Sequence, residues 1–247
     1  NHLSKKNIKC PSPIPDRNGH YINTIEDKTC VLMSFLNGKK INNATFDHCQ
    51  QIGELTAKIH LHSKDFTKTR KNGLHQKNWG DIFKKCQNSR DNRFGELYQI
   101  IEQELLYLNN CWPRNLPMGI IHGDIFPDNV FFIDNKVSGL IDFYFSCNDF
   151  YAYDLAITTN AWCFDKKESF NKINFDALLK GYQHHIDMSN DEKIHFNTLL
   201  RGAAMRILVT RLHDQLYHPD GAMVVPKDPF ESFNILKWHQ NNSVFDK

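Results

Sequence analysis

The residues best suited to chemistry lie in one segment of the chain, IHGDIFPDNVFFIDNKVSGLID, which runs from residue 121 to 142. It contains His122, Asp124 and Asn129, and it ends with Asp142, which Phe143 follows. Carboxylate and amide oxygens are good ligands for hard divalent cations, and a further carboxylate can accept a proton from a hydroxyl group. This set of side chains could therefore hold a metal ion against phosphate groups while it activates an alcohol.

The spacing within this segment fits the H-x-D-x-x-x-x-N template of kinase catalytic loops, with an Asp-Phe pair behind it. It predicts Asp124 as the base that orients the acceptor hydroxyl. Asn129 and Asp142 are predicted to bind Mg²⁺ and, through it, the phosphates of ATP. His122 is expected to support the loop from a buried position. Each acid alone would be interpreted as a turn residue, and it is their combination that favours catalysis.

A β-hairpin is the element that must position these ligands. The runs 130–133 and 137–141 are rich in β-formers and are joined through Asp134-Asn135-Lys136, a typical hairpin turn. Antiparallel pairing of the two runs would place Asn129 and Asp142 at the same edge, where both can reach one ion. Pro127 is expected to stiffen the loop before the hairpin.

Around this hairpin the pattern changes from strand to helix along the chain. A first hairpin is expected from residues 21–25 and 29–36, and it ends at Gly38. The segment 64–93 is polar, and only a short helical turn is expected there, around 79–86. Apolar residues at helical spacing predict helices at 46–60, 94–108, 153–163, 174–187 and 191–217. The predicted class is therefore α+β, with a small β part before a mostly helical body.

Composition excludes several classes of protein. The chain has 247 residues, of which 40% are hydrophobic, and it has no apolar run long enough to span a membrane. Its formal net charge of +2 provides no basic surface for a nucleic acid, so neither membrane nor nucleic acid is an expected partner. Seven cysteines without a C-x-x-C spacing suggest neither a disulfide framework nor a zinc site. We therefore expect a cytoplasmic protein, and the sequence does not indicate its oligomeric state.

On these motifs the sequence resembles the homoserine kinase branch of the aminoglycoside phosphotransferase and choline kinase-like proteins. The segments HGDIFPDNVFF, GLIDFYFSCND, RGAAMRILVTR and KDPFESF carry the resemblance, which covers nearly the whole chain. It implies a protein kinase-like fold and transfer of the ATP γ-phosphate to the side-chain hydroxyl of L-homoserine. ATP and Mg²⁺ are the implied cofactors, and the small-molecule acceptor is the implied partner.

The resemblance also implies roles for residues outside the loop. Met33 and Phe35 would belong to a hinge, residues 33–36, whose backbone meets adenine, and Asp154 would brace the catalytic loop. Residues 1–37 would then be the end of a small lobe and residues 38–247 the large lobe. The family's glycine-rich loop, strand lysine and helix glutamate are not identifiable. The chain is therefore expected to be a fragment of a full kinase or a truncated relative that turns over weakly.

A homoserine acceptor carries a carboxylate and an ammonium group, so its site should offer a guanidinium. Arg201, Arg206 and Arg211 lie at five-residue intervals on one predicted helix, and such spacing cannot point all of them at one pocket. We predict Arg206 first and Arg211 second, and a surface or interlobe ion pair is the alternative for both. Tyr144, Asn148 and Asp149 could also line the acceptor site.

Two rival functions follow from the same sequence. The acceptor could instead be an aminoglycoside, choline or methylthioribose, although a cationic antibiotic would demand an acidic rim where the C-terminal helices offer arginines. Alternatively, the chain could be a pseudokinase or a nucleotide-sensing module that has lost the small lobe.

Overall fold

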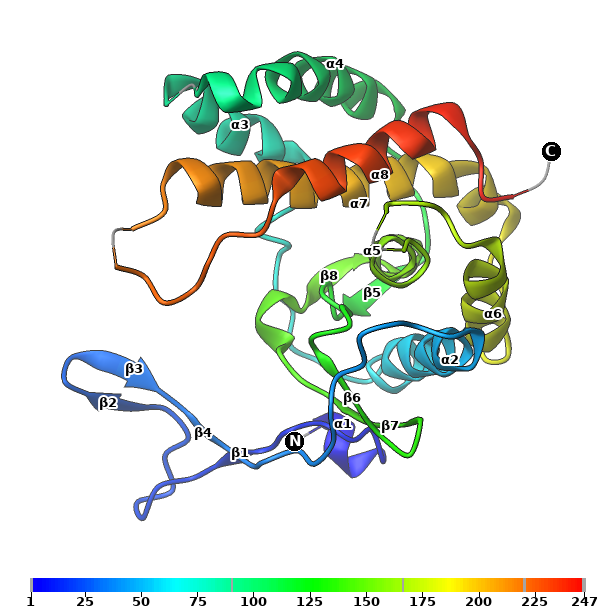
Figure 1. Cartoon of the computed structure of the whole chain (residues 1–247). Helices are drawn as coiled ribbons and strands as arrows, with labels where there is room; N and C mark the ends of the chain where they lie inside the picture. The colour runs from blue at the N-terminus through cyan, green and yellow to red at the C-terminus, as the bar shows by residue number, and fades with distance from the viewer. Residues whose placement is uncertain (1, 90, 166, 220, 246–247) are drawn as a thin grey trace.

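The computed structural model describes residues 2–89, 91–165, 167–219 and 221–245 and shows paired strands beside a helical body (Figure 1). Four two-stranded antiparallel sheets pair β1 with β4, β2 with β3, β5 with β8 and β6 with β7. The strands are β1 Pro13–Ile14, β2 Asn23–Ile25, β3 Lys28–Cys30, β4 Leu32–Met33, β5 Met118–Ile121, β6 Val130–Ile133, β7 Lys136–Leu140 and β8 Cys147–Phe150. The α-helices are α1 His2–Lys5, α2 Phe46–His62, α3 Trp79–Asn88, α4 Gly95–Cys111, α5 Tyr151–Trp162, α6 Lys172–Gln183, α7 Asn190–Leu216 and α8 Pro229–Asn241.

The first hairpin is shorter than predicted. β2 pairs with β3 as expected, but the run 29–36 does not continue as one strand. Its second half, β4, pairs instead with β1 in the proline-rich entry, where no strand was predicted. The carbonyl of Ser12 accepts a further hydrogen bond from the Ser34 N–H at 2.9 Å. The β1–β4 pair therefore forms a stalk from which the β2–β3 hairpin projects (Figure 1).

The stalk joins the helical body by crossing the β6–β7 hairpin at very short range. Gly38 has a φ of +134°, and a Cβ atom there would lie 2.3 Å from the Ser138 hydroxyl. Leu36 packs directly on Gly139, where a Cβ atom would meet its side chain at 2.4 Å. Because only glycine permits this backbone and this distance, Gly38 and Gly139 hold the N-terminal strands against the hairpin.

Two helix pairs form the centre of the body. α2 and α6 approach backbone to backbone, since Cβ atoms at Gly53 and Gly181 would each lie 2.0 Å from a carbonyl oxygen of the other helix. α7 is the longest helix, at about 40 Å, and it packs against α3, α5 and α8. Its N-terminus has a capping box in which Ser189 and Glu192 satisfy each other's backbone N–H groups.

The predicted helices are confirmed with small shifts in their ends, and further elements of the body differ from the prediction. α3 is a full helix where only a short turn was expected, because Trp79, Phe83 and Cys86 form a buried face. β8 and α8 were not predicted. α8 begins with Asp228 as N-cap and Pro229 in its first turn, a local signal that the sequence does contain.

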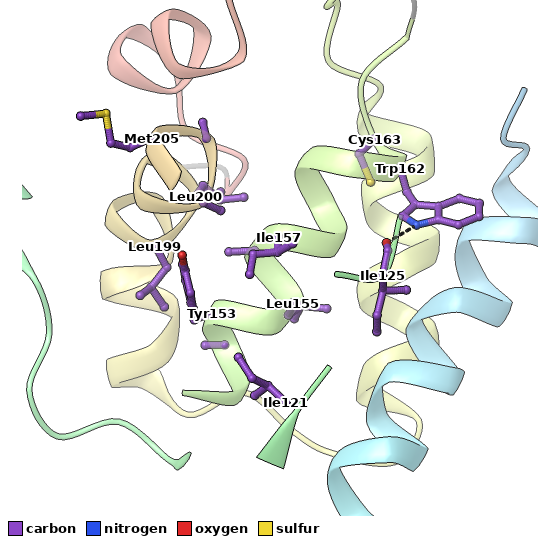
Figure 2. Close-up of a cluster of buried hydrophobic side chains, with 14 of the residues drawn as sticks. Ile121, Ile125, Tyr153, Leu155, Ile157, Trp162, Cys163, Leu199, Leu200 and Met205 are labelled. Atoms are coloured by element: carbon purple, nitrogen blue, oxygen red, sulfur yellow. Dashed lines mark hydrogen bonds between the residues drawn. The ribbon is translucent and has the colours of Figure 1, made fainter. Parts of the chain in front are cut away.

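The hydrophobic core lies where α5 meets β5, the catalytic segment and α7 (Figure 2). Among the described residues, no helix is long and apolar enough to cross a membrane.

Candidate active site

The hairpin that was predicted to gather the metal ligands is present. β6 and β7 are joined through Asp134 and Asn135, whose φ angles of 48° and 58° fit a two-residue hairpin loop. At the other end the Ile141 N–H donates to the Asn129 carbonyl at 2.9 Å. Asn129 and Asp142 therefore flank the same edge of the hairpin, as the spacing predicted.

Asn129 joins this edge to the catalytic loop. Its Nδ2 donates to both the backbone carbonyl and the Oδ2 of Asp124, each at 2.9 Å. Because the amide nitrogen is engaged in this way, the Oδ1 of Asn129 is the end of the side chain that is left to act as an oxygen ligand. One side chain thus fixes the position of Asp124 and presents a donor beside it.

Asp142 adopts a left-handed backbone conformation, with φ of 64° and ψ of 66°. A residue with a Cβ atom adopts this conformation at a cost, and such strain concentrates at functional sites. The Oδ1 of Asp142 accepts a bond from the Tyr144 N–H at 3.3 Å, while the residue itself is exposed. The next residue, Phe143, packs edge-on against the His122 ring at 4.7 Å. The turn therefore directs the carboxylate outward and the aromatic ring inward.

Asp154 of α5 binds the backbone at the start of the catalytic loop. Its carboxylate is fully buried and accepts the backbone N–H groups of His122 at 2.9 Å and Gly123 at 2.7 Å. The same carboxylate accepts a bond from His60 Nε2 at 3.0 Å, and the Nδ1 of His60 lies 3.0 Å from the Tyr182 hydroxyl oxygen. The predicted brace is thus part of a longer network that reaches α2 and α6.

His60 and Tyr182 were missed because they lie far from the loop in sequence, and nothing local identifies them. His122 was predicted to be a buried support, and it is fully buried with its Nε2 at 3.2 Å from the Ile141 carbonyl. α5 contributes a second support, since Trp162 Nε1 donates to the Ile125 carbonyl at 2.7 Å (Figure 2). The loop is therefore fixed at its beginning and at its middle by the same helix.

Burial and charge tune the titrating groups. Burial raises the pKa of Asp124 above its ordinary value; the charges of Asp142 and Asp128 add to this, and Arg206 and the Asn129 hydrogen bond oppose it. A carboxylate with a raised pKa is a better base near neutral pH. Burial lowers the pKa of His122, which favours the neutral ring.

Asp154 carries the negative charge of the buried network. Burial alone would raise the pKa of Asp154, but the hydrogen bond and charge of His60, together with His122, outweigh it and the pKa is lowered. Asp154 is therefore a buried carboxylate that stays ionised, because the His60 side chain and the backbone N–H groups of His122 and Gly123 donate hydrogen bonds to it.

The donor set at the hairpin edge fits a hard divalent cation. Asn129 offers an amide oxygen and Asp142 an exposed carboxylate, and both are oxygen ligands of the kind that Mg²⁺ prefers. Within the described ranges no cluster of three or more His, Cys, Asp or Glu side chains could hold a metal by itself.

A cavity of about 540 Å³ lies beside the catalytic loop. Phe126 and Pro127 of the loop form one wall, and residues of α5, α7 and α8 form the others. Its charged lining consists of Arg211, Asp165, Glu168 and Glu231. Three acids and one arginine therefore line this cavity, and Glu231 is 2.7 Å from the Arg211 guanidinium.

The two predicted substrate arginines differ in position. Arg211 faces the cavity but also donates to the Asp228 carbonyl at 2.9 Å. Arg206 is buried behind the loop, where its Nη1 donates to the Gly123 carbonyl and its guanidinium lies 5.1 Å from the Phe145 ring. These contacts favour a positioning role for Arg206, and its contact with a substrate stays a prediction.

The other candidates for the acceptor site lie elsewhere. Asn148 and Asp149 accept bonds from Arg70 N–H at 2.9 Å and from Asn72 Nδ2 at 2.7 Å, so they hold the segment that precedes α3. Tyr144 is exposed, and the guanidinium of Arg70 lies 5.6 Å from its ring. None of these three lines the cavity beside the loop.

The predicted hinge follows β4. Met33 borders a second cavity, of about 320 Å³, with Phe143 and β5 on the other side. The side chain of Phe35 is 90% exposed. Their contact with adenine stays a prediction.

Comparison with known proteins agrees with this geometry. Residues 1–186 match the model of the phosphotransferase enzyme family. The chain therefore belongs to the phosphotransferase enzyme family. Among its curated relatives are a homoserine kinase of Parvibaculum lavamentivorans, 44% identical over 97% of this chain and 75% of the relative, and one of Rhodospirillum rubrum, 43% identical over 97% and 74%.

Solved structures of more distant kinases share the fold. An amicoumacin kinase in complex with AMP-PNP and Ca²⁺ superposes with a TM-score of 0.71 at 14% identity, over 97% of this chain and 73% of the other. A spectinomycin phosphotransferase gives 0.66 at 16% identity, over 98% and 77%. The α+β, protein kinase-like architecture predicted from the sequence is thereby confirmed.

Proposed function

We propose that this chain is a homoserine kinase, which transfers the γ-phosphoryl group of ATP to the side-chain hydroxyl of L-homoserine and yields O-phospho-L-homoserine for threonine biosynthesis. The observation that carries the proposal is the convergence of Asp124, Asn129 and Asp142 on one hairpin edge. The curated homoserine kinases, above 40% identical over nearly the whole chain, support the choice of acceptor.

In this proposal the catalytic residues divide the work between base and metal site. Asp124 accepts a hydrogen bond from the acceptor hydroxyl and takes its proton as the phosphoryl group is transferred. Asn129 and Asp142 hold Mg²⁺, which neutralises charge on the phosphates when it is bound. Met33 and Phe35 belong to the hinge beside adenine. Fixed groups suit this chemistry because phosphoryl transfer depends on positioning and charge stabilisation.

We assign the acceptor to the 540 Å³ cavity beside the loop, where Arg211 is the guanidinium of the lining and is paired with Glu231. Its mixture of acids and one arginine suits a small molecule that carries both charges. The curated homoserine kinases support homoserine over an aminoglycoside as this molecule. The free state of all seven cysteines agrees with a reducing compartment, and we propose a cytoplasmic enzyme.

The test is an ADP-release screen on the complete gene product with Mg²⁺-ATP. The acceptors are homoserine, choline, methylthioribose and an aminoglycoside. We expect turnover with homoserine alone, and its dependence on Mg²⁺ is measured by titrating the metal after chelation. Turnover with another of these acceptors and not with homoserine would reject the proposed acceptor. ADP release with none of them would favour the pseudokinase alternative.

A further inference from the structure

One conspicuous sequence segment, KDP at residues 227–229, is not used by the chemistry described so far. In the structure it lies against the catalytic loop, because Lys227 Nζ donates to the Oδ2 of Asp128 at 2.8 Å. Asp128 stands directly before Asn129 in the loop. The ion pair therefore connects the loop between α7 and α8 to the residue next to a predicted metal ligand.

The backbone at Lys227 is held in place while its ammonium group is accessible. Gln215 of α7 donates to the carbonyls of Pro226 at 3.2 Å and Lys227 at 3.4 Å. On the other side Asp228 caps α8 by accepting the Phe230 N–H at 2.9 Å. The side chains of Lys227 and Asp128 are nevertheless 57% and 45% exposed. A small solute can therefore reach both charges.

The pair lies next to the loop wall of the cavity assigned to the acceptor. Lys227 Nζ is 5.9 Å from the ring of Phe126, which with Pro127 forms that wall. The guanidinium groups nearby already have partners, since Arg211 is bound to Glu231 and Arg206 to the Gly123 carbonyl. Lys227 combines contact with the loop and an exposed ammonium group.

Asp128 is the matching anion. Its Oδ2 accepts the hydrogen bond from Lys227 Nζ at 2.8 Å, so that an acidic and a basic side chain face each other beside the loop. An exposed pair of this kind contributes little to stability, and its members exchange partners readily.

We propose that Lys227 and Asp128 recognise the α-amino acid end of the acceptor. Lys227 binds the carboxylate of the acceptor, and Asp128 binds the ammonium group of the acceptor. A zwitterion presents the same two charges as the ion pair and can satisfy both residues when it separates them. This inference rests on the proposed function, because the hydroxyl at the far end of the same molecule must reach Asp124. It makes the two residues determinants of specificity and assigns them no part in the phosphoryl transfer itself.

The experiment compares three acceptors on the complete gene product: homoserine, 3-aminopropan-1-ol, which lacks the carboxylate, and 4-hydroxybutanoate, which lacks the amine. In Lys227→Met we expect kcat/KM for homoserine to fall at least about tenfold, while kcat/KM for 3-aminopropan-1-ol changes less than about twofold. In Asp128→Asn the same selective loss should appear for homoserine against 4-hydroxybutanoate. Lys227→Arg keeps the charge and should retain most of the homoserine activity.

Lys237→Met is the matched control, because Lys237 is an exposed lysine of α8 whose partner Glu96, 3.6 Å away, lies far from the loop in sequence. It should leave all three acceptors unaffected. Equal losses for homoserine and 3-aminopropan-1-ol in Lys227→Met, or a rise in the KM for ATP alone, would overturn the inference and leave the proposed function standing. Failure of the unmodified enzyme to phosphorylate homoserine would instead reject the proposed function, and the inference with it.

Discussion

The catalytic segment and the N-terminal strands differ sharply in how they are held. From Ile121 to Asp154 the loop is tied to α5 by buried hydrogen bonds, and both of these residues are inaccessible to solvent. The β1–β4 stalk and the β2–β3 hairpin expose large apolar side chains, among them Ile22, Leu32 and Phe35. The segment proposed to position the phosphoryl group is therefore held by buried bonds, while the predicted adenine side presents an open apolar surface.

This difference predicts which substitutions affect stability, which affect turnover and which affect nucleotide binding. Substitutions beneath the catalytic loop should destabilise the fold and reduce turnover together, because the same bonds serve both. Substitutions at the hairpin edge should affect turnover alone. Substitutions in the exposed strands should affect nucleotide binding with little change in stability.

The largest effect is expected for Asp154→Ala. It leaves His60 and the N–H groups of His122 and Gly123 without their buried acceptor, which should cost about 3–5 kcal/mol of unfolding free energy. Urea unfolding followed by circular dichroism measures this cost. Asp176→Ala, at an exposed residue of α6 that pairs with Lys172, is the control and should stay within about 0.5 kcal/mol. Similar midpoints for the two variants would contradict the bracing role.

Asp142→Ala should separate turnover from stability. Loss of the exposed carboxylate removes a metal ligand, and we expect kcat to fall about 10³-fold, equivalent to about 4 kcal/mol of barrier. The melting temperature should change by no more than a few degrees, because the side chain is not part of the core. If higher Mg²⁺ concentrations produced no change in the residual rate, the assignment as a ligand would lose support.

The buried His239 should make stability depend on pH. Burial lowers its pKa from 6.5 to about 3, and its Nε2 lies 2.8 Å from the Asn160 Oδ1. Below pH 6.5 the His239 side chain binds a proton in the unfolded chain but not in the folded chain. The free energy of unfolding therefore falls as the pH drops from about 6.5 toward 3. For this group the loss is about 2–4 kcal/mol. His239→Gln should flatten this limb of a pH series of urea titrations. His184→Gln, at an exposed position, should leave the limb unchanged.

The smallest effect on stability is expected for Phe35→Ser. Since the ring is 90% exposed, the unfolding free energy should change by less than about 0.5 kcal/mol. The KM for ATP should nevertheless rise severalfold if the residue belongs to the hinge. An unaltered KM for ATP would remove Phe35 from the nucleotide site and weaken the contrast between the two regions.

Local spacing explains how much the sequence could predict. The β6–β7 hairpin and the placing of Asn129 and Asp142 at its edge were predicted correctly, because these residues lie within one short segment that has its own turn signal. His60 escaped because it meets Asp154 across 94 positions of the chain, a contact that no local pattern encodes.

The residues of the proposed acceptor site were harder to predict, because they also lie far apart in the sequence. The charges of the cavity come from the segment between α5 and α6, from α7 and from α8, and α8 was not predicted although Asp228 and Pro229 signal its start. Without α8, the engagement of Arg211 by Glu231 could not be foreseen. Arg206 was predicted to bind the acceptor, and only the structure shows that its guanidinium is buried at the Gly123 carbonyl.

The central claim is that Asp124 acts as the base at a site that Asn129 and Asp142 complete. The most direct measurement is the rate of phosphate transfer from γ-labelled ATP to homoserine by the unmodified enzyme and by Asp124→Asn, at saturating Mg²⁺. The amide keeps the shape of the side chain and cannot take the proton, so we predict that the rate falls by about 10³-fold or more while the KM for ATP stays within about threefold. Transfer at an undiminished rate in Asp124→Asn would contradict the account.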